Sequence, residues 1–246
     1  TIIYKNYSIE QITDSAFTYD ASSKAEDVVK AGIDSRKIQA GEGKYVGEYK
    51  ASSVATVDEA VEAYKTAPSA ENYVAINKAL ASADRIEVEE GQMYRLRNIS
   101  RVNATLYLAP ADTRFTAAES NVVNADQVFA FVPAANEGEF YMYNPNYNLY
   151  LGKLVATETQ PVVMSTTENA GTWKFESKPS GESKVINVNR ESGSHDGLHL
   201  AGDNTRLVPW TSGAEASQWF IELVKEVPAV VPAEGYVTAN LPFAVK

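Results

Sequence analysis

The sequence predicts a mainly β chain with an α-helical N-terminal region, and three observations lead to that prediction. A pattern of four short apolar segments occurs three times between Tyr94 and Val224. Apolar residues at helical spacing are confined to residues 1–86. From Glu87 onward, apolar and polar residues alternate between Asn, Gly, Pro, Asp and Ser, which is typical of short strands joined by turns.

The repeat recurs at a fixed spacing in its first segment. Apolar-x-apolar stretches begin 46 residues apart, at Tyr94, Phe140 and Ile186. Each unit closes on an aromatic segment, at Phe129, Trp173 and Trp219. A period of this length indicates one supersecondary unit that is repeated. We expect a domain over 87–224 with units at about 92–133, 138–178 and 184–224.

A closed arrangement of these units follows from the need to protect strand edges. Four strands in each of three units make twelve short strands, and an open sheet of that kind would expose unpaired backbone groups. A threefold barrel with a hairpin cap removes most of those edges. The sequence therefore predicts a β-trefoil of three four-stranded repeats.

The helical region contains the pattern of a helical hairpin at about 56–83. Thr56-Val-Asp-Glu59 resembles a capping box, and Val57, Val61 and Tyr64 follow on one face. Pro68 interrupts this pattern, and Ser69 is placed to cap a second helix. A short turn between two such helices predicts an antiparallel pair.

The ends of the chain give further expectations. Lys24–Ala31 is expected to be another helix and Thr1–Ser8 a leading strand. Residues 225–246 are expected to be a linker, rich in Val, Pro and Ala, and then the start of a truncated following module. Because the chain also begins with Thr rather than Met, we expect a fragment of a larger multidomain protein whose signal peptide lies outside this fragment.

Composition excludes several classes of function. A net charge of −10 without a Lys/Arg cluster argues against nucleic acid as a partner. The absence of cysteine removes disulfides and thiolate metal sites. No apolar run is long enough to cross a membrane, so we expect no membrane insertion. No pattern indicates a cofactor, because the Gly41–Gly47 segment lacks the Gly-Lys-Ser/Thr ending of a phosphate-binding loop.

The closing motif of the first unit, Asn124-Ala-Asp-Gln127-Val-Phe129, resembles the Asn-x-x-Gln-x-Trp motif of ricin-type β-trefoil lectins. This family is also called carbohydrate-binding module family 13, and the resemblance covers residues 87–224. It implies a carbohydrate-binding domain with a glycan as possible ligand, and it implies Asn124 and Gln127 as binding residues. In the second and third units only the aromatic residue of the motif is kept.

The resemblance also locates where sugar-binding residues should lie, and the sequence departs from the family there. An Asp is expected just after the second strand, but the residues are Ala109, Gly152 and Ala201. A stacking aromatic is expected at the end of the third strand, and only Trp210 matches. The resemblance therefore implies a site in the third unit at Trp210, with Asp203 and Asn204 as polar partners.

Aromatic residues in the second strands suggest a further surface. Tyr107, Tyr150 and His199 are each flanked by leucines, which point to the opposite side of a strand. If the leucines fill the barrel, Tyr150 and its counterparts face outward and could stack on sugars. Alternatively, they cover the barrel wall or pack on the helical hairpin.

Catalytic and metal-binding patterns are weak. His195 and His199 have the His-x-x-x-His spacing of zinc ligands, but Gly193 and Gly197 argue against a helix there. Ser194-His195-Asp196 has the residue types of a catalytic triad, yet consecutive side chains cannot form the relay. Acidic residues such as Glu137 and Glu139 are expected in solvated turns. We therefore expect no enzyme activity.

The function expected from the sequence is a non-catalytic carbohydrate-binding accessory module of a larger protein. A structural spacer or protein-interaction β-trefoil that has lost sugar binding is the alternative, since no unit keeps a complete site. The order of helical hairpin, trefoil and following strand resembles the C-terminal regions of secreted multidomain proteins of gut anaerobic bacteria. That resemblance implies a bacterial protein, secreted or at the cell surface, whose partners include neighbouring modules of the same polypeptide.

Overall fold

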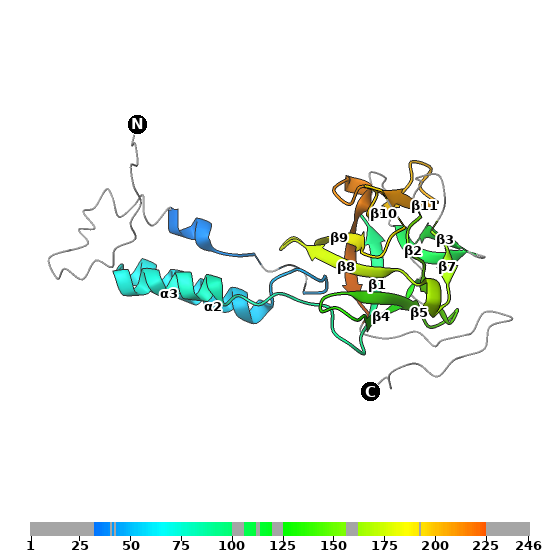
Figure 1. Ribbon diagram of the computed structural model, residues 1–246. Helices are drawn as coiled ribbons and strands as arrows, with labels where there is room; N and C mark the ends of the chain where they lie inside the picture. Colours follow the sequence, from blue (N-terminus) through cyan, green and yellow to red (C-terminus); the bar gives the residue numbers. More distant parts are fainter. Residues whose placement is uncertain are drawn as a thin grey trace. The chain divides into compact units, whose positions relative to one another are not determined.

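The computed structural model describes most of the chain as two compact units (Figure 1). The described residues are 32–39, 41, 43–99, 106–111, 114–119, 125–155, 162–191 and 193–224. Within them, the helical unit comprises 32–39 and 52–83, and the barrel unit comprises 41–51 and 84–224. The expected strand at 1–8, the expected helix at 24–31 and the expected linker and module at 225–246 lie outside the described residues.

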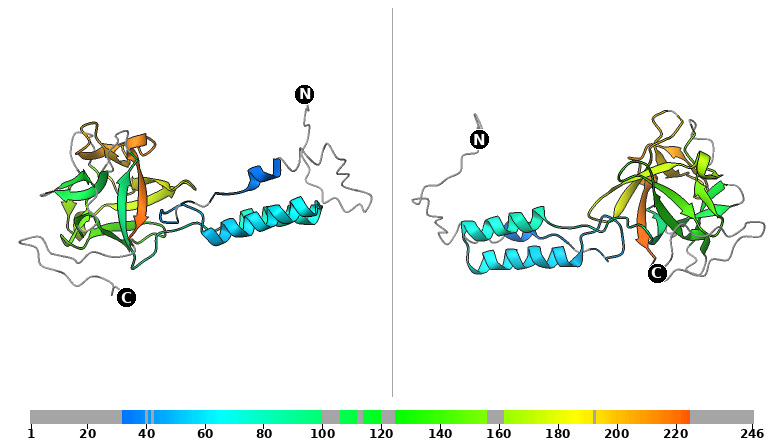
Figure 2. Two further views of the ribbon diagram at one scale, coloured as in Figure 1. Left: turned by 180° about the vertical axis from the view of Figure 1, so that it is seen from behind. Right: turned by 60° about the horizontal axis from the view of Figure 1, so that its bottom comes forward.

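The helical unit is built around a pair of antiparallel helices (Figure 2). It contains the short turn η1 (Asp34–Arg36) and the helices α2 (Ala51–Thr66) and α3 (Ala70–Ala81). Its core consists of buried apolar side chains from the two helices and from the residue before η1, namely Ile33, Val57, Val61, Tyr64, Ile76 and Ala79. None of the helices in the described part of the chain is long and apolar enough to span a membrane.

Of the two helix N-caps predicted for the hairpin, Ser69 is confirmed and Thr56 is wrong. The Ser69 side chain accepts a hydrogen bond from the backbone N–H of Asn72, so the cap of α3 is confirmed. The Thr56 cap is wrong, because α2 already begins at Ala51 and the Thr56 hydroxyl donates to the carbonyl of Ser52 at 2.9 Å. The sequence Ala51-Ser-Ser-Val-Ala has no strong breaker, so the helix extends one turn beyond the capping pattern.

Six strands of the barrel unit form a closed ring of antiparallel pairs. Around the ring they are β1 (Met93–Asn98), β4 (Phe129–Pro133), β5 (Phe140–Asn144), β8 (Thr172–Ser177), β9 (Glu182–Asn187) and β12 (Gln218–Leu223). The ring closes where β12 pairs with β1. Each ring strand therefore has a hydrogen-bonded neighbour on both sides, which removes the exposed edges.

The other six strands of the described residues form three hairpins. They are β2 (Leu106–Ala111) with β3 (Arg114–Glu119), β6 (Leu149–Leu151) with β7 (Met164–Ser165), and β10 (Gly197–Leu200) with β11 (Leu207–Trp210). A short turn precedes each closing strand, namely η2 (Ala125–Gln127), η3 (Thr167–Asn169) and η4 (Glu215–Ser217). Three four-stranded units around a closed six-stranded ring are a β-trefoil, which confirms the predicted fold class.

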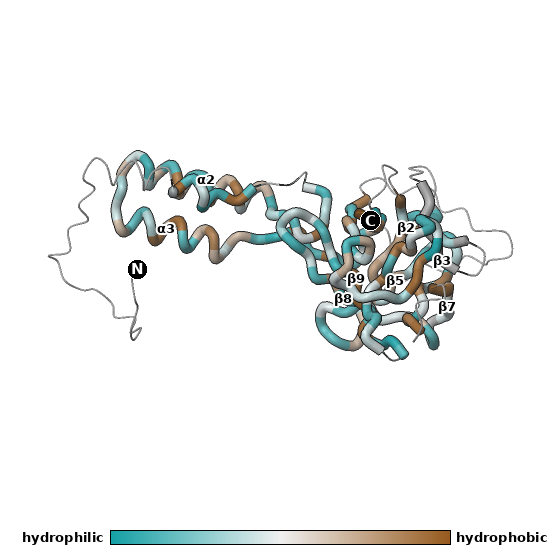
Figure 3. Tube along the Cα trace, turned by 90° about the horizontal axis from the view of Figure 1, so that it is seen from above, coloured by the Kyte–Doolittle hydropathy of each residue, from teal (hydrophilic) through white to brown (hydrophobic). Residues whose placement is uncertain are grey.

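Apolar and polar residues both occur along the strands of the barrel unit (Figure 3), and the buried apolar side chains form its core. The largest are Trp173 and Trp219, both 0% exposed, at the closing aromatic positions of the second and third units. Phe129 holds the same position in the first unit and is also 0% exposed. Side chains of this size dominate the stability of a small barrel, because each buries a large apolar area.

The repeat spacing expected for the third unit is wrong. β1 pairs Tyr94 with Phe129, β5 pairs Phe140 with Trp173, and β9 pairs Ser183, rather than Ile186, with Trp219. The third unit thus begins three residues earlier than the regular 46-residue spacing implies. A shift by an odd number of residues exchanges the two faces of a strand. The 46-residue spacing would align Val188 with the buried Leu96. Val188 is 37% exposed, which agrees with the corrected register.

The corrected register reveals a buried asparagine at the same position of each unit. Asn98, Asn144 and Asn187 are 3%, 0% and 0% exposed. Each donates from Nδ2 to the carbonyl before a closing aromatic, on Gln218 at 3.5 Å, Val128 at 3.3 Å and Thr172 at 2.9 Å respectively. These side chains therefore join neighbouring strands at the end of the backbone hydrogen-bond ladder, next to a turn.

The boundary between helical and strand regions differs from the expected one at residue 86. Val46 N–H donates to the carbonyl of Ile221 at 2.9 Å, and Gly47 N–H donates to that of Ile86 at 2.8 Å. Residues 43–50 therefore belong to the barrel unit, together with 84–88. Gly47 has φ +97°, and a Cβ there would lie 2.6 Å from the carbonyl oxygen of Lys178, so only glycine fits this close approach.

Candidate ligand-binding site

The third unit contains an aromatic group at the base of its hairpin. Trp210, the last residue of β11, pairs with Gly197 of β10 and is half-buried. The His195 ring stacks on it with centroids 4.8 Å apart and an interplanar angle of 22°. The His199 ring lies 5.8 Å from Trp210 at 39°. We call these three side chains the Trp210 cluster.

Hydrogen bonds from neighbouring segments fix the orientation of His199. Its Nδ1 lies 2.8 Å from the hydroxyl of Ser217. That hydroxyl donates to the carbonyl of Thr211 at 2.8 Å, so it accepts from His199. His199 therefore donates from Nδ1 to Ser217.

Asp196 lies beside the Trp210 cluster, and sequence reasoning considered it only as part of a triad. Its carboxylate accepts from the backbone N–H of Ser212 at 2.9 Å and from the Ser212 hydroxyl at 3.2 Å. It thereby joins the loop before β10 to the segment after β11. No sequence motif contains both residues, so only the hairpin register brings them together.

Asp203 and Asn204 lie in the turn at the opposite end of this hairpin. Leu200 pairs with Leu207 next to the turn, and Trp210 lies three residues further along, about 10 Å at 3.3 Å per residue. The structure therefore does not bring the two expected polar partners next to Trp210. Their role in binding stays a prediction from the resemblance.

The Asp203 carboxylate is engaged within its own turn. It accepts from the backbone N–H of Arg206 at 3.0 Å and of Thr205 at 3.1 Å, and it forms an ion pair with the Arg206 guanidinium. These bonds, with those from Arg206 the largest cause, hold the pKa of Asp203 well below its usual range. Asn204, at φ +59°, supplies the left-handed residue of the turn.

The remaining expected site residues belong to the first two units. Gln127 ends η2 and is only 2% exposed, so its side chain lies inside the protein. Asn124 lies outside the described residues. Tyr150 is half-buried, with its ring 5.0 Å from that of Tyr143 and 6.1 Å from that of Tyr141. Gln127 and Tyr150 therefore lie in the first and second units and are not part of the Trp210 cluster.

The second strands do not carry three equivalent aromatic residues. Tyr107 pairs with Arg97 and Tyr150 with Tyr143, but the equivalent residue of β9, Ile186, pairs with Gly197 rather than His199. The expected equivalence of His199 with the two tyrosines is thus wrong in the third unit. Only the first two units have an aromatic residue at this position.

Tyr107 covers the barrel wall, as in the alternative interpretation of these rings. It is 7% exposed, and its hydroxyl donates to the Glu222 carboxylate at 3.0 Å. Burial is the largest cause that raises the pKa of this phenol. The guanidinium of Arg95 lies 5.9 Å from the centre of the ring.

No group of three or more His, Asp or Glu side chains able to hold a metal occurs among the residues that the structure describes. No family model matches the sequence. No curated protein matches it either.

Several solved structures resemble the chain. A mosquitocidal holotoxin matches with 15% identity and a TM-score of 0.45 over 59% of this chain and 19% of its own. A Polyporus squamosus lectin bound to a human-type influenza-binding epitope matches with 13% identity and a TM-score of 0.42 over 54% of this chain and 49% of its own. The BEL β-trefoil matches with 11% identity and a TM-score of 0.43 over 55% of this chain and 95% of its own. The chain thus spans less than half of the first two proteins.

Proposed function

We propose that this chain is a non-catalytic carbohydrate-binding module that engages a glycan at the Trp210 cluster. The observation that carries the proposal is the half-buried Trp210 ring at the base of the β10–β11 hairpin, with two imidazoles beside it. An indole ring offers a flat apolar surface for the C–H face of a sugar, and nearby imidazoles offer hydrogen bonds to its hydroxyls.

The polar side of this site uses residues different from those of the ricin-type pattern. The His199 imidazole, which is held at Nδ1 by Ser217, lies 5.8 Å from the Trp210 ring and is the polar side chain of the proposed site. The His195 ring already stacks on Trp210, so a sugar on that face replaces His195, while a sugar on the opposite face leaves it in place.

The second candidate function is a spacer or protein-interaction β-trefoil without sugar binding. This second function is favoured by the residues at the positions where the ricin-type pattern has its carboxylate. Ala109 is 5% exposed, and a Cβ on Gly152 would lie 2.8 Å from the carbonyl oxygen of Val163. The strand register makes His199, rather than the expected Ala201, the equivalent residue of the third unit. A carboxylate at Ala109 or Gly152 would therefore be buried or would clash.

A glycan array followed by calorimetry distinguishes the two functions. Under the first proposal the protein binds a defined set of sugars, Trp210→Ala abolishes binding, and Trp210→Phe keeps part of it. Tyr150→Ala, a matched change of a half-buried aromatic in the second unit, should leave the affinity unchanged. Equal weak responses from the native protein and Trp210→Ala would refute the site. No binding at millimolar sugar would favour the second function.

We further propose that the chain belongs to a larger bacterial protein that is secreted or held at the cell surface. The order of hairpin, trefoil and following strand in the sequence supports this. Fractionation of cells that carry the full-length gene should place the protein outside the cytoplasm. Cytoplasmic protein, or glycoside hydrolase activity of the purified chain, would contradict the proposal of an exported, non-catalytic module.

A further inference from the structure

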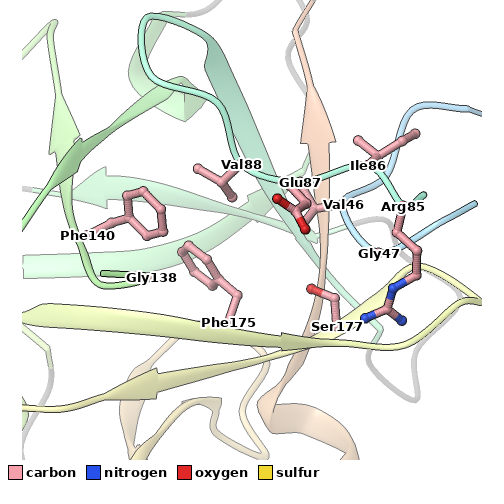
Figure 4. Close-up of a pocket in the computed structure, with 10 residues that line it drawn as sticks. All are labelled: Val46, Gly47, Arg85, Ile86, Glu87, Val88, Gly138, Phe140, Phe175 and Ser177. Carbon is pink, nitrogen blue, oxygen red and sulfur yellow. The ribbon is translucent and has the colours of Figure 1, made fainter. Parts of the chain in front are cut away.

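The barrel unit contains a cavity of about 290 Å³ that is separate from the Trp210 cluster (Figure 4). Its walls come from the segments 46–47 and 85–88 and from strands β5 and β8 with their flanking turns. The side chains that give it chemical character are Arg85, Glu87, Val88, Phe140, Phe175 and Ser177. No motif in the sequence joins these residues.

One end of the cavity is apolar and firmly supported. The Phe140 and Phe175 rings lie 5.9 Å apart at 19°, and Phe175 lies 4.9 Å from Phe131 in the barrel core. Val88 also packs against this core. Because the rings rest on close-packed neighbours, this wall exists without a ligand.

The other end carries two charged side chains that have no partner within the described residues. Arg85 and Glu87 make no hydrogen bond or ion pair with any other residue that the structure describes, and they do not pair with each other. Figure 4 shows them on one segment, with Glu87 between the phenylalanines and Arg85. Ser177 lies near Arg85, but its hydroxyl is bonded to that of Ser183 at 2.7 Å.

The backbone that presents these charges is fixed. Ile86 N–H donates to the carbonyl of Glu48 at 2.8 Å, and the Ile86 carbonyl accepts from Gly47 at 2.8 Å. In an extended segment, residues two apart point to the same side at a spacing of about 6.6 Å. Arg85 and Glu87 therefore face the same space at a distance that a small ligand can bridge.

We propose that this cavity binds a small zwitterion with an apolar group, of the class of an apolar α-amino acid. The ligand carboxylate pairs with the Arg85 guanidinium, which is suited to two parallel hydrogen bonds. The ligand ammonium donates to Glu87, and the apolar side chain packs on Phe140 and Phe175. The cavity volume is at the lower end of ligand pockets, so it accommodates one residue rather than an oligosaccharide.

Calorimetric titration of the protein with L-leucine, L-leucinamide, N-acetyl-L-leucine and galactose tests each part of this match. We expect L-leucine to bind, and both derivatives to bind at least about tenfold more weakly, since each lacks one of the two charges. Galactose should not bind at this cavity. Equal affinity for all three leucine compounds, or galactose binding that depends on Arg85, would overturn the assignment.

Two variants assign the binding to this cavity. Arg85→Gln should weaken L-leucine binding at least about tenfold and leave the weak binding of L-leucinamide unchanged. Glu87→Gln should have the converse selectivity, sparing N-acetyl-L-leucine. Arg190→Gln, in the loop after β9, is the charge-matched control and should have no effect. Unchanged L-leucine affinity in both cavity variants would refute the proposal, and circular dichroism verifies that each variant is folded.

The outcome is independent of the proposed glycan function. Trp210→Ala should abolish glycan binding and leave L-leucine binding intact, whereas Arg85→Gln should do the reverse. Loss of both activities in either variant would show that the two regions are not separate sites, and would contradict this inference.

Discussion

The inside of the barrel and the surface of its hairpins follow the threefold symmetry to different degrees. Inside, every unit places a buried asparagine beside the strand that carries a closing aromatic. On the hairpins, the equivalent positions are the buried Tyr107, the half-buried Tyr150 and Gly197. Close packing and buried hydrogen bonds restrict what the interior accepts, whereas on the hairpins the burial of the equivalent position itself differs between the units.

The interior symmetry is itself incomplete around the two tryptophans. Trp219 donates from Nε1 to the carbonyl of Leu198 at 2.8 Å. The buried Nε1 of Trp173 has no hydrogen-bond partner in the described residues. The Leu151 carbonyl instead accepts from the N–H of Gly171 at 2.8 Å. The barrel thus repeats the shape of the closing residue without repeating its polar contact.

Removal of a closing aromatic should produce the largest loss of stability. Trp173→Ala and Trp219→Ala are each expected to lower the free energy of unfolding by about 3–5 kcal/mol, because each leaves a large cavity in the core. Urea titration followed by circular dichroism measures this. Trp210→Ala, on the hairpin, is the control and should cost much less. A change below about 1 kcal/mol for Trp173→Ala would contradict the assigned core position.

Removal of a buried asparagine should produce the next largest effect. Asn187 accepts from the N–H of Leu154 at 2.8 Å and donates to the carbonyl of Thr172 at 2.9 Å. Asn187→Ala leaves the Leu154 N–H without its acceptor, while the Thr172 carbonyl keeps the N–H of Val188 at 2.7 Å, and we expect a loss of about 2 kcal/mol. The exposed Asn136→Ala should stay within about 0.5 kcal/mol. Equal losses in these two variants would remove the distinction between interior and surface.

The unequal polar contacts of the tryptophans predict a smaller difference. Trp219→Phe should lower the free energy of unfolding by about 1 kcal/mol more than Trp173→Phe, because only Trp219 loses a hydrogen bond and leaves a buried carbonyl unpaired. The two variants remove the same atoms, so each is the control for the other. Chemical denaturation of both, under identical conditions, measures the difference. Identical losses would show that the Leu198 hydrogen bond contributes nothing net.

The barrel was predictable because its signal is repeated. Apolar alternation and three closing aromatics define the units, and neither depends on contacts between distant residues. The first strand of the third unit, β9, was predicted in the wrong register. Val185 and Ile186 are both apolar and both buried, so alternation alone fits two registers. The strand pairing selects one of them, and pairing is a tertiary property.

The candidate site was predictable only in part. Trp210 was found because a single residue type carried the resemblance, but its neighbours His195 and Asp196 lie across the hairpin and have no fixed spacing from it. Asp203 was selected by its closeness in sequence, and the antiparallel register separates it from Trp210. Arg85 and Glu87 gave no signal, since their cavity is formed by segments far apart in the chain.

The smallest effect is expected at the tip of the β10–β11 hairpin. The pKa of Asp203 is held below its unfolded value of about 3.9, chiefly by hydrogen bonds from Arg206. The ionised carboxylate therefore adds stability that is present above about pH 4 and is lost as pH falls toward the depressed pKa. Because Asp203 is exposed, solvent screening limits its contribution to less than about 1 kcal/mol.

Asp203→Asn tests this contribution through the pH dependence of thermal unfolding. The variant should be slightly less stable than the native chain at pH 6, and the difference should shrink as the pH is lowered from 4 to 2, because Asp203 then becomes protonated in the unfolded native chain while it is still ionised in the folded one. Glu137→Gln changes an exposed carboxylate in the turn between β4 and β5 and should give a curve parallel to the native one. A constant difference between Asp203→Asn and the native chain at all pH values would show that the turn is stabilised by shape rather than by the charge of Asp203.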